Sequence, residues 1–176
     1  MLRSLSLTLL AGLLLTGCST MKQPPLRTVA HVDLDRYLGD WHVIANIPYF
    51  LENGKVATLD RYAKRADGRM DNTFVFRRKS FDAPEESWKG VAWVHDPATN
   101  AEWRVQFFWP VRLAYLVIDL DPDYRWAVVG HPSRNYLWVL ARARHLPDDV
   151  YAGILRRAAA QGYDAARIAK VPQPAE

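Results

Sequence analysis

Cysteine is almost absent from this chain. Of its 176 residues only Cys18 is a cysteine, so an intrachain disulfide is impossible. The five histidines are scattered, without the His-x-x-x-His or Cys–His spacing by which proteins bind transition metals. We therefore expect neither a disulfide framework nor a metal site, and nothing in the sequence calls for a cofactor.

Catalytic motifs are missing as well. The chain has no Gly-x-Ser-x-Gly elbow and no glycine-rich phosphate loop. Its one thiol is predicted below to carry lipid, which removes it as a nucleophile. The acidic pairs Asp148-Asp149 and Glu85-Glu86 fall at a predicted helix start and in a loop, where favourable helix-end charge and solvated surface explain them. We expect a binding protein rather than an enzyme.

Long runs of one charge are also lacking. The formal net charge is +4, and the basic residues are interspersed with acids. Such a distribution is typical of a solvated surface and lacks the basic patch of a nucleic-acid-binding protein. We expect no nucleic-acid partner.

One apolar run stands at the start of the chain. Arg3 provides a positive charge, and the apolar run from Leu5 to Leu15 is shorter than a transmembrane helix requires. The run ends in Leu15-Thr16-Gly17-Cys18, which resembles a lipobox. Residues 1–17 are therefore predicted to be a lipoprotein signal peptide, with Cys18 as the lipidated first residue; the alternative is a secretory signal with an incidental cysteine. Ser19, in place of aspartate, resembles an outer-membrane address.

A short tether follows the predicted lipid anchor. Residues 18–30 have little to bury, and Pro24-Pro25 favours extended chain. We expect this linker to hold one folded domain, residues 31–176, near the membrane.

The domain reads as a series of short strands separated by turn residues. Asp67-Gly68 is a hairpin signal, and Asp96-Pro97 and Asp121-Pro122 also mark turns. Eight strands in sequential hairpins indicate an all-β fold, an up-and-down antiparallel barrel whose closure removes unpaired edges. The expected strands are 40–48, 56–65, 70–80, 87–95, 101–109, 113–121, 124–131 and 135–143.

Alternation predicts which side chains share a face. In one strand Trp103, Val105, Phe107 and Trp109 should point inward. In the last strand, Tyr136, Trp138, Leu140 and Arg142 share one face, and Leu137, Val139 and Ala141 share the other. Because both faces are apolar, that strand must be covered on both sides. Asp119 has inward parity on its own strand and could be buried.

An outer cover is supplied by a C-terminal helix. Pro147 and Asp148 suit its start and Gly162 its end. Its stripe of Val150, Ile154, Leu155 and Ala158 is expected to dock on Leu137 and Val139. A short extended piece near 167–171 should finish the chain.

Three motifs in order resemble the lipocalin signatures. They are Gly39-x-Trp41, preceded by Arg36-Tyr37-Leu38; the run from Asp123-Tyr124 to Val129; and the run from Asn135 that ends in Arg142. Phe107-Phe108-Trp109-Pro110 also matches the bacterial subgroup, the Blc-type outer-membrane lipoproteins. The resemblance covers nearly the whole chain.

This resemblance implies a structural role for the signature residues. Trp41 and Arg142 should form a cation–π contact that seals the closed end of the barrel. Two residues depart from the subgroup pattern: Val43 replaces a common acid, and Asp119 replaces a small apolar residue. Both departures bear on the polarity of the pocket.

The resemblance also implies a small hydrophobic ligand inside the barrel, and for the bacterial subgroup a fatty acid or lysophospholipid. Twenty-one aromatic residues, many of inward parity, could line such a pocket. An arginine such as Arg61, Arg77, Arg78 or Arg112 could meet an anionic head group. The predicted lining residues are Trp103, Val105, Phe107, Tyr115 and Trp138.

Other interpretations remain open at this point. A barrel of the same shape could bind haem or a pigment, which needs an inward histidine. It could carry a lipid-modifying enzyme, or be a filled barrel that acts only as an envelope tether. For the preferred lipid-binding interpretation we expect a lipid-anchored protein of the outer membrane that faces the periplasm, possibly as a homodimer.

Overall fold

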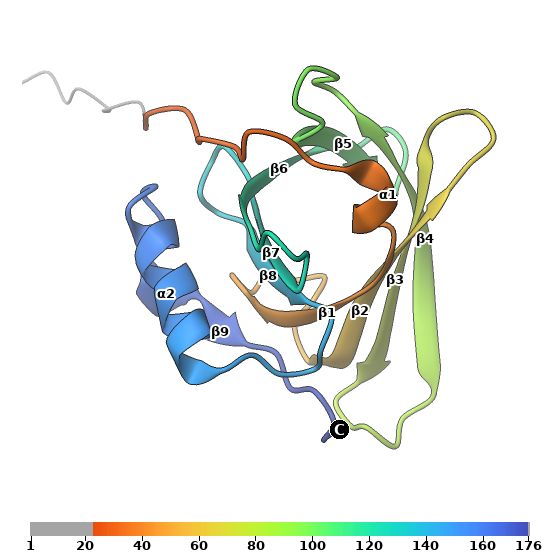
Figure 1. Ribbon diagram of the computed structural model, residues 1–176. Helices are drawn as coiled ribbons and strands as arrows, with labels where there is room; N and C mark the ends of the chain where they lie inside the picture. Colours follow the sequence, from red (N-terminus) through yellow and green to blue (C-terminus); the bar gives the residue numbers. More distant parts are fainter. Residues whose placement is uncertain (1–22, 176) are drawn as a thin grey trace, which may run out of the picture.

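The strands of this protein form one antiparallel sheet that closes on itself. The computed structural model describes residues 23–175, so the predicted signal peptide and Cys18 lie outside the described residues. Strand β1 pairs with both β2 and β8, which closes the barrel (Figure 1). The predicted eight-stranded up-and-down barrel is confirmed. Its strands are β1 (Gly39–Asn46), β2 (Lys55–Lys64), β3 (Met70–Arg78), β4 (Glu85–Val94), β5 (Glu102–Gln106), β6 (Leu113–Leu120), β7 (Trp126–Gly130) and β8 (Leu137–Ala141).

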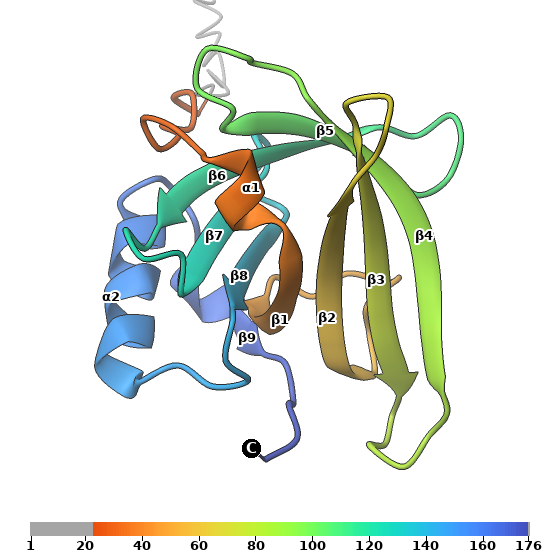
Figure 2. The ribbon, with the colours of Figure 1, turned by 45° about the vertical axis from the view of Figure 1, so that its right-hand side comes forward.

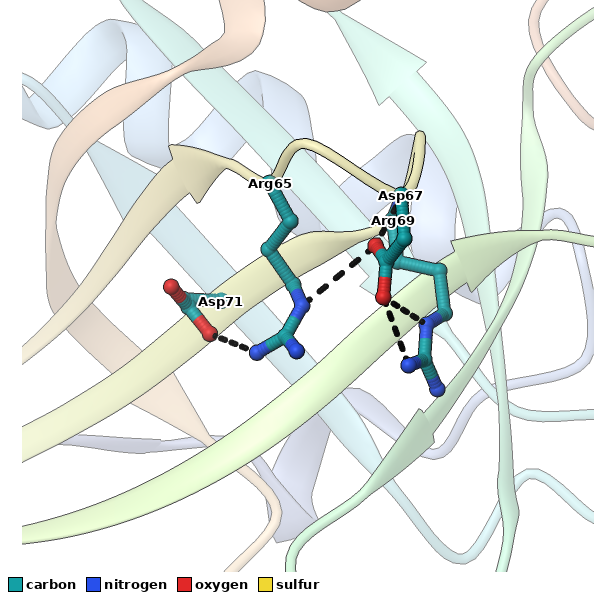
Figure 3. A network of polar contacts seen from close by, with 4 residues as sticks. All are labelled: Arg65, Asp67, Arg69 and Asp71. Atoms are coloured by element: carbon teal, nitrogen blue, oxygen red, sulfur yellow. Dashed lines mark hydrogen bonds and ion pairs between the residues drawn. The ribbon is translucent and has the colours of Figure 1, made fainter.

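The turn between β2 and β3 lies where the Asp-Gly signal predicts it. Gly68 has φ of +80°, a left-handed conformation that glycine adopts without steric cost. Ion pairs surround the turn: Arg65 contacts Asp71 at 2.6 Å and Asp67 at 3.4 Å, and Arg69 contacts Asp67 at 2.6 Å (Figure 3). These side chains are partly exposed, so their ion pairs contribute little to the stability of the fold. Their main effect is to constrain the conformation of the turn.

Strand β5 is shorter than alternation suggests, and the inward prediction for Trp109 is wrong. The strand ends at Gln106, and the chain then bends through Phe107 and Phe108. Side-chain alternation stops with the strand, so Trp109 is 85% exposed.

Two apolar clusters occupy the two sides of the barrel wall. The inner cluster fills the closed half of the barrel and includes Trp41, Trp103 and Leu140. The outer cluster lies between the wall and helix α2 (Asp148–Ala159), where Leu137 and Val139 meet Ile154 and Ala158 with Val150 and Leu155 at the margin. The predicted outer helix and its docking face are therefore confirmed (Figure 1).

A bulge in β6 reverses the expected orientation of Asp119. The register with β7 shifts between Val117 and Asp119, so alternation is interrupted there. Val117 belongs to the inner cluster, whereas Ile118 belongs to the outer one. Asp119 faces α2 and pairs with Arg157 at 2.6 Å, so its predicted inward orientation is wrong.

The C-terminus continues beyond α2 as a clasp on the barrel wall (Figure 2). After a short 3₁₀ turn, η1 (Ala165–Arg167), strand β9 (Ala169–Lys170) pairs with β1. The Ala57 amide donates to the Pro172 carbonyl at 2.9 Å. Gln173 Nε2 donates to the Val43 and Thr58 carbonyls at 2.9 and 3.0 Å, which bridges β1 and β2 where their pairing ends.

Candidate functional site

The barrel encloses an apolar cavity at one end. Its volume is about 280 Å³. Its rim comes from the loop after β1, including Phe50, and from the loop after β5, including Phe108 and Val111. Helix α1 (Leu34–Tyr37) immediately precedes β1 and covers the opposite end (Figure 1). The interior is therefore open through the rim and closed at the α1 end.

Four of the five predicted lining residues face this cavity. They are Val105, Phe107, Tyr115 and Trp138. Trp103 instead lies beneath the cavity, fully buried, with its ring stacked on Tyr115 at a centroid distance of 5.0 Å. Its Nε1 donates to the Asn100 carbonyl at 2.6 Å. Trp103 therefore supports the residues at the bottom of the cavity and does not line the cavity itself.

The position of Phe107 depends on a missing side chain on the neighbouring strand. A Cβ at Gly90 would lie 2.8 Å from Phe107 Cδ1, which real contacts do not allow. Gly90 therefore creates the space that the Phe107 ring occupies. Phe107 remains inside although it lies one residue beyond β5.

A group of tyrosines forms the floor between the cavity and the closed end. Tyr37 and Tyr62 each share a hydrogen bond with the Tyr115 hydroxyl, at 2.9 and 3.0 Å. Burial raises the pKa of all three hydroxyls well above that of a free tyrosine. The floor is therefore polar, uncharged and internally hydrogen-bonded.

Two carboxyl groups, Glu52 and Asp60, face the cavity. Glu52 accepts hydrogen bonds from Trp138 Nε1 at 3.2 Å, from the Tyr49 hydroxyl at 3.1 Å and from Asn46. Burial raises the pKa of Glu52 despite these donors. Burial, together with the nearby Glu52 charge, raises the pKa of Asp60 to about 8.

Sequence reasoning missed both acids. Alternation with the inward Tyr62 could have placed Asp60 on the inner face of β2. Glu52 lies in the loop after β1, where no periodicity applies, so the sequence held no signal for it.

The closed end is organised around Trp41 and Arg142. The Arg142 guanidinium carbon lies 3.7 Å from the centroid of the Trp41 ring, within cation–π range. The same guanidinium donates to the carbonyls of Asp40, Arg36 and Leu38 at 2.8, 2.7 and 2.9 Å. Arg142 thereby ties the segment that contains α1 to the start of β1, as the motif resemblance implies.

The other signature residues support this closure. Gly39 has φ of +93°, and a Cβ there would lie 3.4 Å from Arg142 Nη1. The Tyr124 hydroxyl accepts from the Asp33 amide at 2.8 Å, and the Asp33 carboxylate caps α1. Asp123 is exposed in the turn before β7, and its amide donates to Asp121 at 3.1 Å.

Comparison with known proteins decides the family. The lipocalin-like domain matches residues 32–173. The chain belongs to the lipocalin family.

This lipocalin is similar to curated relatives in bacteria and plants. It is 33% identical over 168 residues to the outer membrane lipoprotein Blc of Escherichia coli K12, covering 93% of each chain. It is 31% identical over 160 residues to temperature-induced lipocalin-1 of Arabidopsis thaliana, covering 84% of this chain and 83% of that one. The resemblance to the Blc-type lipoproteins is confirmed.

Solved structures agree in fold at lower identity. Insecticyanin from the tobacco hornworm superposes with a TM-score of 0.69 at 20% identity, covering 86% of each chain. Apocrustacyanin C2 superposes with a TM-score of 0.65 at 11% identity, covering 81% of each chain. These likenesses show a shared barrel architecture.

The arginines suggested for an anionic head group do not line the cavity of this lipocalin. Arg61 pairs with Asp40 at 2.5 Å, Arg77 and Arg78 pair with acids on β4, and Arg112 lies over Trp93. Lys55 packs on rings beside the cavity: its Nζ lies 4.2 Å from the Phe76 ring centroid and 4.3 Å from that of Trp88. It also donates one of its three N–H groups to the Leu51 carbonyl.

Two structural features are absent from residues 23–175. Across this part of the chain, no group of three or more His, Cys, Asp or Glu side chains is arranged to hold a metal ion. In the same residues, no helix combines the length and apolar character needed to cross a bilayer.

Proposed function

We propose that this lipocalin binds one single-chain lipid, a fatty acid or a lysophospholipid, and stores or transports it at the outer membrane. The observation that carries the proposal is the apolar, aromatic-walled cavity of about 280 Å³ with one open end. That volume lies near the lower limit of small-molecule pockets, which favours one slim chain over a two-chain lipid. Similarity to bacterial outer membrane lipoproteins supports the location, and membership of the lipocalin family supports a small hydrophobic ligand.

The affinity would come from removing the acyl chain from water. Each buried methylene contributes about 0.8 kcal/mol, so ten would contribute roughly 8 kcal/mol before the ordering cost of the chain and protein. Phe107, Tyr115 and Trp138 offer rings on different strands around one space. Trp103 would act indirectly, by holding the Tyr115 ring in place.

Membrane attachment belongs to the same proposal. Cys18 lies outside the described residues, and its lipidation remains a prediction from the Leu-Thr-Gly-Cys pattern. A tether of residues 18–30 would then hold the barrel close to the source of its ligand, facing the periplasm.

The alternative of a haem-binding barrel gains no support from the cavity. Among the residues of 23–175 that line it, none is a histidine. His131 lies in the turn after β7, next to Tyr136 on the rim, and is hydrogen-bonded to Ser133. The described cavity wall therefore lacks the inward histidine that this alternative needs.

The test combines native ligand identification with titration. Mass spectrometry of lipid extracted from protein purified from its native host should give one class of single-chain lipid. Adding fatty acid or lysophospholipid to delipidated protein should change Trp emission saturably, because Trp138 and Trp88 face the cavity.

A paired substitution locates the binding site. Phe107→Arg should abolish the titration, since it places a charge in the apolar cavity. Phe81→Arg is the matched control, because Phe81 is 43% exposed and lies in the loop after β3. A folded Phe107→Arg protein that binds with parental affinity would place the ligand elsewhere.

A further inference from the structure

The cavity wall is chemically one-sided. Glu52 and Asp60 face it from the loop after β1 and from β2, whereas β5 and β6 contribute mainly apolar and aromatic side chains. The Glu52 carboxylate has three donors within the protein. Within residues 23–175, Asp60 has no hydrogen-bond donor and no basic partner, and the charge that acts on its pKa is that of Glu52. An acceptor thus faces the cavity without a partner from the protein.

A second unpartnered acceptor lies beside Asp60. Asn72 is 2% exposed and lines the cavity from β3, and its Oδ1 has no hydrogen-bond partner among the described residues. Its Nδ2 is directed to the Tyr62 hydroxyl at 3.5 Å. Because Tyr62 pairs with Asn72 and Asp60 pairs with Phe74, Asp60 and Asn72 are diagonal neighbours on the inner face. Such neighbours lie roughly 7 Å apart, and one donor group between them can reach both.

The cavity lacks a positive charge to balance these acceptors. Among its described lining residues none is Lys, Arg or His. Lys55 is held between Phe76 and Trp88, and donates to Leu51. Leaving a buried acceptor unpaired costs stability, so the site favours an occupant that brings donors.

We propose that the cavity selects single-chain amphiphiles whose polar end carries a protonated amine, with the ammonium between Asp60 and Asn72. This inference rests on the proposed function: among single-chain lipids it favours those with an amino head group, such as an amine-bearing lysophospholipid, over fatty acids. An ammonium has three N–H donors and no acceptor, which complements two unpartnered oxygens. Its charge balances the acidic wall, and the alkyl chain lies along the aromatic wall toward the rim. A carboxylate in the same place would be repelled by ionised Asp60, and would find a donor only when Asp60 is protonated.

Proton linkage follows from the groups around Asp60. Glu52 faces it from the loop after β1, Tyr62 from its own strand, Tyr37 from α1 and Tyr115 from β6. The tyrosines stay protonated over the accessible pH range. An ammonium binds the ionised form of Asp60, so its affinity should rise as pH increases through about 8. An anionic ligand should show the opposite trend.

The test compares three probes that share a twelve-carbon chain: dodecylamine, dodecanol and dodecanoate. Each is titrated into delipidated full-length protein at pH 7 and pH 9, with Trp emission as the readout. At pH 9, where Asp60 is ionised, we expect dodecylamine to bind at least about tenfold more tightly than dodecanoate, which corresponds to about 1.4 kcal/mol; the preference should be smaller at pH 7. Asp60→Asn should remove most of this preference. Asp82→Asn, an identical charge change at an exposed loop position outside the cavity, should leave it unchanged.

The outcomes separate this inference from the proposed function. If none of the three probes binds, the cavity does not hold single-chain amphiphiles and the proposed function fails. If dodecanoate or dodecanol binds as tightly as dodecylamine, only the amine inference is overturned. An unchanged preference in folded Asp60→Asn overturns it too. Should that variant not fold, the ranking of the three probes on the parent protein decides alone.

Discussion

Replacing Asp60 by Asn should stabilise the protein in a strongly pH-dependent way. Asparagine keeps the size and hydrogen-bonding ability of the protonated acid but cannot ionise. In the folded protein burial raises the pKa of Asp60 to about 8, whereas in the unfolded chain it returns to an ordinary value near 4. Between these two values the folded state binds one more proton than the unfolded state. The free energy of unfolding therefore falls as pH rises, and asparagine removes this loss.

The magnitude follows from the width of that pH window. Each pH unit costs about 1.4 kcal/mol, so four units between pH 4 and pH 8 give an upper limit of about 5 kcal/mol. Asp60 keeps some contact with solvent through the cavity, which lowers the effective cost. We expect the stability difference between Asp60→Asn and the parent to grow from near zero at pH 4 to roughly 2–5 kcal/mol at pH 8.

Urea denaturation at one-unit pH steps, followed by Trp fluorescence, measures this difference directly. Subtracting the parent curve from the variant curve removes the titration of all other groups, including most of the Glu52 contribution. Asp82→Asn serves as a control for the loss of one surface charge and should give a nearly flat difference. A flat difference for Asp60→Asn would show that Asp60 is solvated in the folded protein. A variant that is less stable at pH 8 would show that the carboxylate accepts hydrogen bonds.

Three further predictions concern other parts of the chain. Trp41→Ala should lower the free energy of unfolding by about 3–5 kcal/mol because it empties a buried site. In a double-mutant cycle with Arg142→Ala, measured by chemical denaturation, the two losses should differ from additivity by roughly 0.5–2 kcal/mol. Strictly additive losses would contradict the Trp41–Arg142 contact. Gly130→Ala should cost about 1–3 kcal/mol, since its Cβ would lie 2.5 Å from the Tyr163 hydroxyl. Tyr163→Phe should recover part of that loss in the double variant, and equal losses in both backgrounds would assign the clash to other atoms. Cys18→Ser should release the protein from membrane fractions or leave it unprocessed, as cell fractionation and mass spectrometry would show; unchanged partitioning with outer membranes would refute lipidation at this position.

The barrel could be predicted from the sequence because strand order, turn residues and the covered last strand are local or periodic signals. Alternation placed Val105 inside correctly, and it failed for Trp109 and Asp119. It failed because a strand end and a bulge interrupt the two-residue period, and neither is encoded by polarity alone. The pattern of apolar residues could predict the outer cluster because α2 has its own helical period.

The polar side of the candidate site was less accessible to sequence reasoning. The sequence suggested arginines as partners of an anionic head group, but neither alternation nor the family resemblance could predict where their side chains lie. Arg61 pairs with Asp40, and the cavity instead presents Asp60 and Glu52. Glu52 reaches the interior from a loop, so its position depends on hydrogen bonds to Trp138 and Tyr49 that form only after the barrel closes.

The clasp formed by the C-terminus has a consequence for the order in which the protein is made. Strands β1 and β2 part beyond His42, and residues 169–173 supply the hydrogen bonds that join them there. Gln173 reaches both strands. A nascent chain that stops before residue 169 therefore has strands β1 to β8 of the barrel but an open seam beside the cavity. The wall is completed only after residues 169–173 have been made, and a truncation that removes them should leave the seam between β1 and β2 permanently open.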